Sequence, residues 1–288
     1  MTKILLAGST GYLGSHILKA LIERNIEVRT VVRNTNKLEA ILSKGNSIEV
    51  IQAQLTTPQS LINCCDNIDT VISTVGITKQ KDGLTYMDVD YQANLNLLNE
   101  AKNSGVRKFI YVSVLNGVQL QHLDICKAKE KFVQELINSG LDYCIIRPNG
   151  FFSDMSEFYE MAKKGRIYLF GNGEIKANPI SGLDLAIECI NAIENEDKEI
   201  NIGGPQTLTQ NEIAEIAFGA AQTKIKITYI PDWVRRLVLY ISNIVLSKKK
   251  FGPIQFIMTV MAMGMIAPEY GNHKLKDFFI ALNNENAG

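Results

Sequence analysis

Residues 3–14 read Lys3-Ile4-Leu5-Leu6-Ala7-Gly8-Ser9-Thr10-Gly11-Tyr12-Leu13-Gly14. A short apolar run, typical of a buried strand, passes directly into a glycine-rich turn and then into a segment of helical period. In such a unit the first glycine permits the tight turn, the second lets backbone N–H groups approach a pyrophosphate, and the third lets the helix pack closely on the strand. We therefore assign every residue from Gly8 to Gly14 to a dinucleotide-binding site.

The next part of the chain continues this alternation of strand and helix. Strands are expected at residues 3–7, 27–32, 48–52, 70–74, 108–113 and 143–147, and helices at residues 12–24, 36–44, 87–104 and 123–139. Gly45, Gly105 and Gly140 each follow one of these helices and suit its left-handed C-terminal conformation. The pattern predicts an α/β protein with a Rossmann-type, doubly wound parallel sheet.

The spacing of turn residues changes after Arg147-Pro148, where glycine and proline become frequent and the elements shorten. We expect an NAD(P)-binding Rossmann domain over residues 1–150, to which residues 179–202 return. A smaller, mainly helical substrate-binding part is expected over residues 151–178 and 203–288. A chain of 288 residues is long enough for both.

Composition excludes several other classes. Lys and Arg together number 30, as do Asp and Glu, so no basic field favours nucleic acid. The five cysteines form no C-x-x-C pair and lie mostly in apolar stretches, which indicates reduced, buried thiols and no metal site. The chain begins with a strand instead of a signal-peptide core, so a cytoplasmic location is expected.

Two apolar segments near the C-terminus, residues 233–246 and 254–267, have two interpretations. Neither reaches the roughly 18 to 20 residues of a membrane-spanning helix. They are either core or lid helices over a substrate, or a surface for peripheral contact with a membrane or a protein through residues 233–267. The lysines at 248–250 and the many methionines allow the second interpretation.

The end of the second expected strand indicates the cofactor. An acidic side chain normally binds the ribose 2′-OH of NAD at this place, but here Arg33 stands there, nineteen residues after Gly14. A guanidinium can engage a 2′-phosphate through two charge-assisted bonds, and Lys37 lies about one helical turn further on. NADP(H) is therefore favoured over NAD(H), with a solvated surface arginine as the alternative.

Several segments resemble the atypical short-chain dehydrogenases/reductases of the NmrA-like and divinyl-chlorophyllide-reductase-like branch. They are the glycine turn and residues 71–76, 90–94, 105–113, 139–148, 179–181, 201–205 and 270–279. The resemblance implies a set of cofactor-lining residues at the fourth strand, Thr74, Val75 and Gly76. It implies a second set at the nicotinamide end, Pro148, Asn149, Gly150 and Phe151. Asp90 and Asn94 would brace the site, or would serve only as helix surface and cap.

The same resemblance breaks down at the catalytic helix. Typical members place a tyrosine four residues before a lysine. Here Lys127 resembles that lysine, which puts Leu123 where the tyrosine would stand. Lys127 can still hold the nicotinamide ribose, and Ser113, like the catalytic serine, ends the fifth strand. The proton donor stays open among four candidates, Tyr86, Tyr91, Tyr159 and His122.

Two functions fit these observations. The first is an NADPH-dependent reductase of an apolar small molecule, acting on a carbon–carbon or carbonyl double bond. The second is a non-catalytic NADP(H)-binding redox sensor, or an assembly or membrane-associated protein, which the missing tyrosine favours. Both need the complete glycine turn.

Overall fold

The computed structural model describes residues 3–39, 41–42, 48–80 and 83–285 of the chain. The chain divides into two compact units. The first unit consists of Met1–Arg147 and Leu185–Ile200, and the second of Pro148–Asp184 and Asn201–Gly288.

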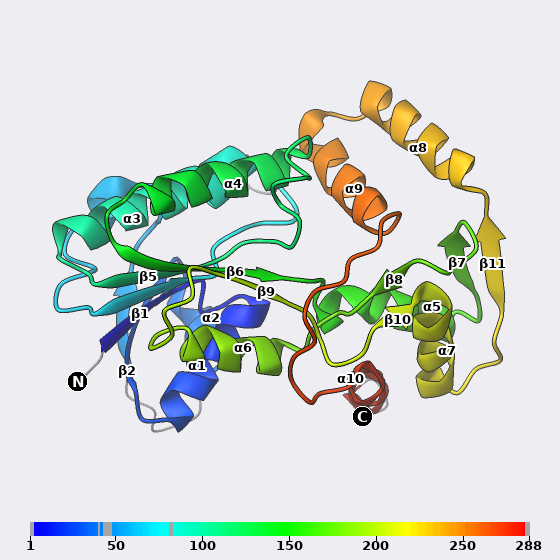
Figure 1. Ribbon diagram of the computed structural model, residues 1–288, viewed down its shortest axis with the longest axis horizontal. Coiled ribbons are helices and arrows are strands. Elements are labelled where there is room, and N and C mark those ends of the chain that lie inside the picture. Colours follow the sequence, from blue (N-terminus) through cyan, green and yellow to red (C-terminus); the bar gives the residue numbers. More distant parts are fainter. Residues whose placement is uncertain (1–2, 40, 43–47, 81–82, 286–288) are drawn as a thin grey trace. The chain divides into compact units, whose positions relative to one another are not determined.

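A seven-stranded sheet forms the centre of the first unit (Figure 1). Its strands are β1 (Lys3–Ala7), β2 (Glu27–Val32), β3 (Glu49–Gln52), β4 (Thr70–Ser73), β5 (Lys108–Val112), β6 (Asp142–Pro148) and β9 (Glu199–Ile202), in the order β3-β2-β1-β4-β5-β6-β9. The pairs from β3 to β6 are parallel. The order turns back at β1, as in a Rossmann fold, so the expected fold class is confirmed.

Helices cover both faces of this sheet. They are α1 (Tyr12–Glu23), α2 (Thr35–Glu39), the 3₁₀ helix η1 (Pro58–Leu61), the π-helix η2 (Met87–Ala93), α3 (Asn94–Asn103), α4 (Asp124–Ile137) and α6 (Gly182–Asn191). Figure 1 shows α3 and α4 on one face and α1 and α6 on the other. Phe132 of α4 meets Tyr111 of β5 edge-on, with ring centroids 4.6 Å apart. The apolar stripe of α4 thus closes one half of the core.

Several predicted boundaries need correction. The helix expected at 87–104 begins as a π-helix, and, apart from the helix expected at 36–44, the other predicted ends lie within two residues of the observed ones. In place of the helix expected at 36–44, the structure has α2, and residues 40 and 43–47, including Gly45, lie outside the described residues. Gly105 and Gly140 have φ values of +72° and +84°, which confirms their left-handed role.

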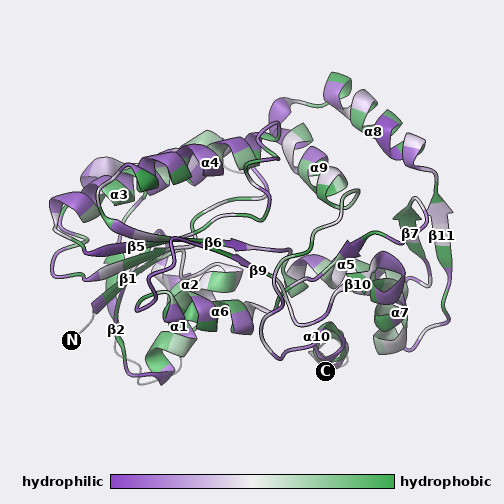
Figure 2. Cartoon of the chain, viewed as in Figure 1, coloured by the Kyte–Doolittle hydropathy of each residue, from purple (hydrophilic) through white to green (hydrophobic). Residues whose placement is uncertain are grey.

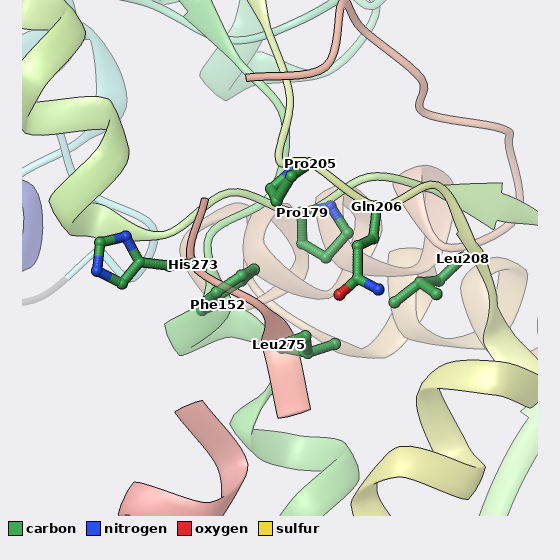
Figure 3. Close-up of a pocket in the computed structure, with 7 residues that line it drawn as sticks. All are labelled: Phe152, Pro179, Pro205, Gln206, Leu208, His273 and Leu275. Carbon is green, nitrogen blue, oxygen red and sulfur yellow. The ribbon is translucent and has the colours of Figure 1, made fainter. Parts of the chain in front are cut away.

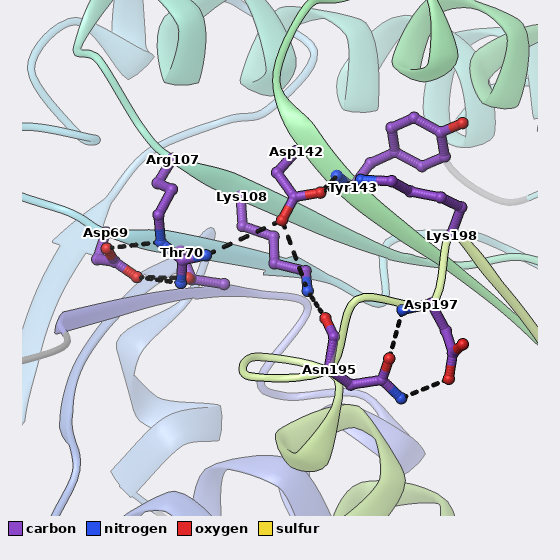
Figure 4. Close-up of polar contacts among 9 residues, drawn as sticks. All are labelled: Asp69, Thr70, Arg107, Lys108, Asp142, Tyr143, Asn195, Asp197 and Lys198. Atoms are coloured by element: carbon purple, nitrogen blue, oxygen red, sulfur yellow. Dashed lines mark hydrogen bonds and ion pairs between the residues drawn. The ribbon is translucent and has the colours of Figure 1, made fainter.

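A polar cluster ties together the amino ends of the strands, opposite the glycine turn (Figure 4). Lys108 is buried, and its Nζ donates to the carbonyl oxygen of Asn195 and lies 3.8 Å from Oδ2 of Asp142. Arg107 donates to both carboxylate oxygens of Asp69, at 3.1 and 3.0 Å. The cluster joins the loop before β9 to β4, β5 and β6.

Helices dominate the second unit. They are the 3₁₀ helix η3 (Phe152–Met155), α5 (Ser156–Lys163), α7 (Gln210–Ala221), α8 (Asp232–Val245), α9 (Lys248–Val260) and α10 (Leu275–Glu285). Two small sheets pair β7 (Ile167–Phe170) with β11 (Ile227–Ile230), and β8 (Lys176–Ala177) with β10 (Leu208–Thr209). Its core lies between α5, α7 and α10, where Tyr159 stacks on Phe279.

Two expectations about the cysteines and the apolar helices can be compared with the structure. All five cysteines are buried and free, as the sequence predicts: Cys64, Cys65, Cys126, Cys144 and Cys189. Within the described residues, no helix combines the length and the apolar character that crossing a membrane requires.

Candidate functional site

The glycine turn, Gly8 to Gly14, has the geometry that the sequence predicts. Gly8 has φ +89°, and its carbonyl oxygen accepts a hydrogen bond of 2.9 Å from the N–H of Gly11. A Cβ on Gly14 would lie only 2.1 Å from that oxygen, and a Cβ on Gly11 would lie 3.2 Å from it. The close approach of α1 to β1 therefore requires glycine at position 14.

The N-terminus of α1 fits an anion. Gly11 is the N-cap, so no side chain caps the helix, and its first turn contains no acidic residue. The uncapped N–H groups and the helix dipole together favour a negatively charged group such as a pyrophosphate. The residues of this turn therefore suit a dinucleotide.

The side chains of the turn point in different directions. The Ser9 hydroxyl is buried and lies 2.5 Å from the hydroxyl of Thr30 on β2, so Ser9 offers its backbone to a ligand. Thr10 is exposed, and Leu13 is packed in the core. The ring of Tyr12 meets His16 edge-on at 5.1 Å.

The end of β4 lies directly against this turn. The N–H of Thr74 donates to the carbonyl oxygen of Ala7 at 3.1 Å. A Cβ on Gly8 would meet the Thr74 hydroxyl at 2.5 Å. The structure thus brings together the glycine turn and the first of the three residues expected to line the cofactor, Thr74, Val75 and Gly76.

A buried ion pair lies under Gly76. Oδ1 of Asp90 and Nζ of Lys129 are 3.0 Å apart, and a Cβ on Gly76 would meet these atoms at 2.6 and 2.8 Å. Oδ2 of Asp90 accepts the N–H of Ile77 at 3.2 Å. Burial raises the pKa of Asp90, and the charge of Lys129 offsets this only in part.

Asn94 holds the same segment from the other side. Its Oδ1 accepts from the hydroxyl of Ser73 at 2.6 Å, and its Nδ2 donates to the carbonyl oxygen of Val75 at 3.1 Å. Asp90 and Asn94 are both fully buried, one in the π-helix and the other directly after it. Neither residue therefore lies on the helix surface, and both hold the backbone that follows β4.

Arg33 and Lys37 are free to meet an anion. Ala7 pairs with Val31, so Arg33 follows β2 at the same edge of the sheet as the glycine turn. Both cationic side chains are exposed, and neither forms an ion pair with any described residue. Among the described residues, no acidic group neutralises them.

Two neighbouring lysines of α4 have opposite environments. Lys127 is exposed on the first turn, where its N–H donates to the carbonyl oxygen of Leu123 at 2.9 Å. Leu123 is part of the core, so the place of the usual tyrosine is apolar. The sequence reading missed Lys129, although it lies on the buried stripe with Cys126 and Val133, at helical spacing.

The Ser113 hydroxyl belongs to a second buried cluster. It lies 3.4 Å from Oε1 of Glu130 and 3.4 Å from Nη1 of Arg147. Arg147 in turn donates to both carboxylate oxygens of Glu130, at 2.5 and 2.9 Å. This ion pair, which the sequence reading also missed, fixes the end of β5 against α4 and β6.

Three of the four proton-donor candidates, the tyrosines, are engaged in other contacts. Tyr86 donates to the carbonyl oxygen of Thr78 at 2.8 Å, and burial raises its pKa to about 12. Tyr91 donates to Glu135, and Tyr159, in the second unit, donates to Asn283. His122 is exposed.

Asn149, the second residue of the second unit, has its side chain turned inward. Its Nδ2 donates to Oδ1 of Asn178 at 2.8 Å and to the carbonyl oxygen of Met265 at 2.5 Å, and its Oδ1 accepts from Gly150 at 2.7 Å. The amide is thus satisfied internally. Phe151 forms a parallel bridge with Ile180 beside it.

Asn178 forms the centre of this network. Its Oδ1 also accepts the N–H of Ala267 at 3.0 Å, and its Nδ2 donates to the Ala267 carbonyl at 2.8 Å. A Cβ on Gly203 would lie 2.2 Å from Asn178, which explains the glycine there. Asn149, Gly150 and Phe151 are therefore held by later segments of the chain, at residues 178–180, 202 and 265.

A shallow hollow lies beside this network in the second unit (Figure 3). It is lined by Phe152, Pro179, Pro205, Gln206, Leu208, His273 and Leu275. It is too shallow to enclose a small molecule, so we do not assign a substrate to it. Nδ1 of His273, which is half exposed, lies 2.8 Å from Oδ1 of Asp184.

A protein-family model described as NAD(P)H-binding matches residues 8–196, a range that begins at the glycine turn. The chloroplastic divinyl chlorophyllide a 8-vinyl-reductase of Arabidopsis thaliana is 30% identical, over 96% of this chain and 75% of its own length. The photosystem II assembly factor Ycf39 of Synechocystis sp. is 26% identical, over 82% of this chain and 73% of its own length.

Among solved structures, the NADPH-dependent quinone oxidoreductase QOR2 of Escherichia coli, complexed with NADPH, is similar with a TM-score of 0.73. The similarity covers 97% of this chain and 99% of that one, at 16% sequence identity. At this identity the comparison establishes the fold.

Proposed function

Because this chain belongs to the NAD(P)H-binding family of atypical short-chain dehydrogenases/reductases, we propose that it is an NADPH-dependent reductase of an apolar small molecule. The observation that carries the proposal is the glycine turn, where Gly14 packs on the Gly8 carbonyl and α1 presents an uncapped, acid-free N-terminus. We assign the glycine turn and the segment after β4, both in the first unit, to the cofactor.

Arg33 and Lys37 support the choice of NADPH. Two exposed cations without an acidic partner among the described residues would attract a 2′-phosphate, and a carboxylate at the end of β2 would repel it. Thr74, Val75 and Gly76 would line the cofactor from β4, with Asp90 and Asn94 fixing their backbone.

When bound, NADPH would supply the hydride for reduction of a carbon–carbon or carbonyl double bond. Lys127, an exposed cation with three donors, would hold the nicotinamide ribose. Pro148, Gly150 and Phe151 would border the nicotinamide with their backbone or ring. Asn149 would do so with its backbone alone, because its side-chain amide forms its hydrogen bonds within the protein. Ser113 would act as a positioning residue through the Glu130–Arg147 pair.

Calorimetric titration with NADPH and NADH tests the cofactor assignment. Arg33→Ala should weaken NADPH binding at least tenfold, or about 1.4 kcal/mol, and leave NADH binding nearly unchanged. Arg24→Ala is the matched control, because Arg24 is also exposed but lies at the other end of α1. Equal losses in the two variants, or no binding of either nucleotide, would refute the assignment.

The buried Leu123 favours a second candidate function, a non-catalytic NADP(H)-binding sensor or assembly protein. Leucine at this place cannot transfer a proton, and one of the relatives is named an assembly factor. Single-turnover assays that follow NADPH oxidation with apolar quinones and conjugated alkenes separate the two functions. Oxidation that depends on substrate and is slowed in Lys127→Met supports the reductase, whereas tight NADPH binding without oxidation supports the binder.

A further inference from the structure

Helix α8 carries an apolar face that no part of the second unit covers. None of its residues is buried, although most are apolar (Figure 2). The α8 face consists of five side chains that are 45% to 67% exposed, Trp233, Leu237, Tyr240, Ile241 and Ile244. Their spacing of three and four residues places them on one side of the helix.

The opposite side of α8 is the one attached to the protein. Arg235 is largely covered, pairs with Asp232 at 2.6 Å, and donates from Nη1 to the carbonyl oxygen of Met258 on α9 at 3.3 Å. A residue two positions from Trp233 points about 200° away from it around the helix. The contact through Arg235 therefore turns the α8 face outward.

The charge around this face is mainly positive, although Asp232 at the start of α8 pairs with Arg235 and Arg236. From Trp233 to Ala267 the sequence contains no Asp or Glu but has five cationic residues, Arg235, Arg236, Lys248, Lys249 and Lys250, in a chain of zero net charge. The three lysines are exposed and form the first turn of α9, which begins three residues after the end of α8. A partner for this region should therefore be apolar and anionic together.

We propose that α8 lies flat in the interface of a membrane that contains anionic lipid. The α8 face would enter the acyl boundary, and Lys248, Lys249 and Lys250 would meet the phosphate groups. Trp233 and Tyr240 have the amphipathic rings that prefer this depth. A second copy of the chain fits less well, because two segments of the same positive charge repel each other.

This inference goes beyond the reductase and does not depend on it. The reductase proposal concerns the nucleotide turn of the first unit, whereas the membrane contact concerns α8 and the lysines after it. Variants of the α8 face should therefore bind NADPH like the wild type, so a failure of one proposal is visible separately from a failure of the other.

The chain's single tryptophan makes the test direct, because Trp233 lies on the α8 face. The full chain is mixed with vesicles of phosphatidylcholine, alone or with phosphatidylglycerol. Co-sedimentation gives the partition coefficient, and the emission of Trp233 reports its surroundings. We expect binding to the anionic vesicles with a blue shift, quenching by brominated acyl chains, and weaker binding in high salt.

Matched variants separate the apolar and the charged contributions. Ile244→Glu should abolish the partition, and Ile62→Glu should not, although Ile244 and Ile62 are 66% and 65% exposed. Replacing Lys248, Lys249 and Lys250 by alanine should lower the partition about 100-fold. The control replaces three exposed lysines elsewhere, Lys19, Lys102 and Lys224, and should stay close to the wild type.

Three results would overturn the proposal. They are equal binding to neutral and anionic vesicles, equal effects of Ile244→Glu and Ile62→Glu, and no binding to vesicles at all. Self-association that Ile244→Glu removes, with no vesicle binding, would assign the face to a second copy instead. Circular dichroism of each variant confirms that it is folded.

Discussion

Nζ of Lys129 lies 3.0 Å from Oδ1 of Asp90, directly under the backbone of Gly76. Both residues lie inside the first unit, so each charge has lost most of its water and depends on the other. The pair supports the loop after β4. Lys129 thus has a structural role, whereas Lys127, two residues earlier, is exposed.

Lys129→Met should therefore lower the free energy of unfolding by about 3 to 5 kcal/mol, because it leaves the buried carboxylate of Asp90 uncompensated. Lys127→Met should change stability by less than about 0.5 kcal/mol, since Lys127 is exposed, and should weaken NADPH binding. Urea denaturation followed by circular dichroism measures the first effect, and calorimetry the second. Equal losses of stability would contradict the assignment of the two lysines.

Gly14→Ala should destabilise the chain by about 1 to 3 kcal/mol and abolish NADPH binding, because its Cβ would lie 2.1 Å from the Gly8 carbonyl oxygen. Gly219→Ala in α7 is the control, since a Cβ there has no neighbour within 4 Å. That change should stabilise the helix by up to about 1 kcal/mol. Thermal unfolding compares the stabilities of the two variants. If the Gly14→Ala variant is as stable as the wild type and still binds NADPH, the turn tolerates a side chain at this position.

The ion pair of Asp69 and Arg107 predicts a pH dependence. Hydrogen bonds from Arg107 hold the pKa of Asp69 below its usual value. Its contribution to stability is thus present above the unfolded pKa of about 3.9, and is lost as the pH falls through the lower pKa of the folded state.

Asp69→Asn should accordingly lower the free energy of unfolding at neutral pH and have almost no effect at pH about 2. Both side chains are partly exposed, so the neutral-pH effect should stay below about 1 kcal/mol and shrink in concentrated salt. Urea denaturation at the two pH values measures it, with Arg107→Gln and the double variant completing the cycle. A loss of the same size at acid pH would rule out the ion pair as its cause.

Glu130→Gln should destabilise by about 3 kcal/mol or more, because it removes the charge that compensates the buried Arg147. Glu199→Gln removes the other partner of Arg147, 3.1 Å away, but Glu199 is half exposed and its loss should cost less than about 1 kcal/mol. Chemical denaturation gives both values. Equal losses of stability in Glu199→Gln and Glu130→Gln would show that the burial of the Arg147–Glu130 pair does not determine its contribution to stability.

The fold could be predicted because its signals are local. The glycine turn needs only neighbours within seven residues, and each strand and helix shows its own period in the sequence. The sequence therefore predicts the turn, the end of β2 just before Arg33, and the left-handed glycines after α3 and α4 at the residues where the structure has them.

The partners of the buried polar groups could not be found in this way. Asp90 and Lys129 are far apart in the sequence, as are Asn149 and Met265, and no periodicity connects such pairs. For Lys129 a signal did exist, since a cation on an apolar stripe implies a buried partner. The short-chain dehydrogenase pattern instead assigns the functional lysine of this helix to Lys127.

The amide of Asn178 has a consequence for synthesis on the ribosome. It forms hydrogen bonds with Asn149, earlier in the sequence, and with Ala267, much later in the sequence. The network at the start of the second unit is therefore incomplete until residue 267 has left the exit tunnel. Until then the carbonyl and amide groups of this network must form hydrogen bonds with water instead. The nascent chain thus carries an unfinished second unit through the translation of more than a hundred residues after Asn149, which is a long interval for chaperones to act.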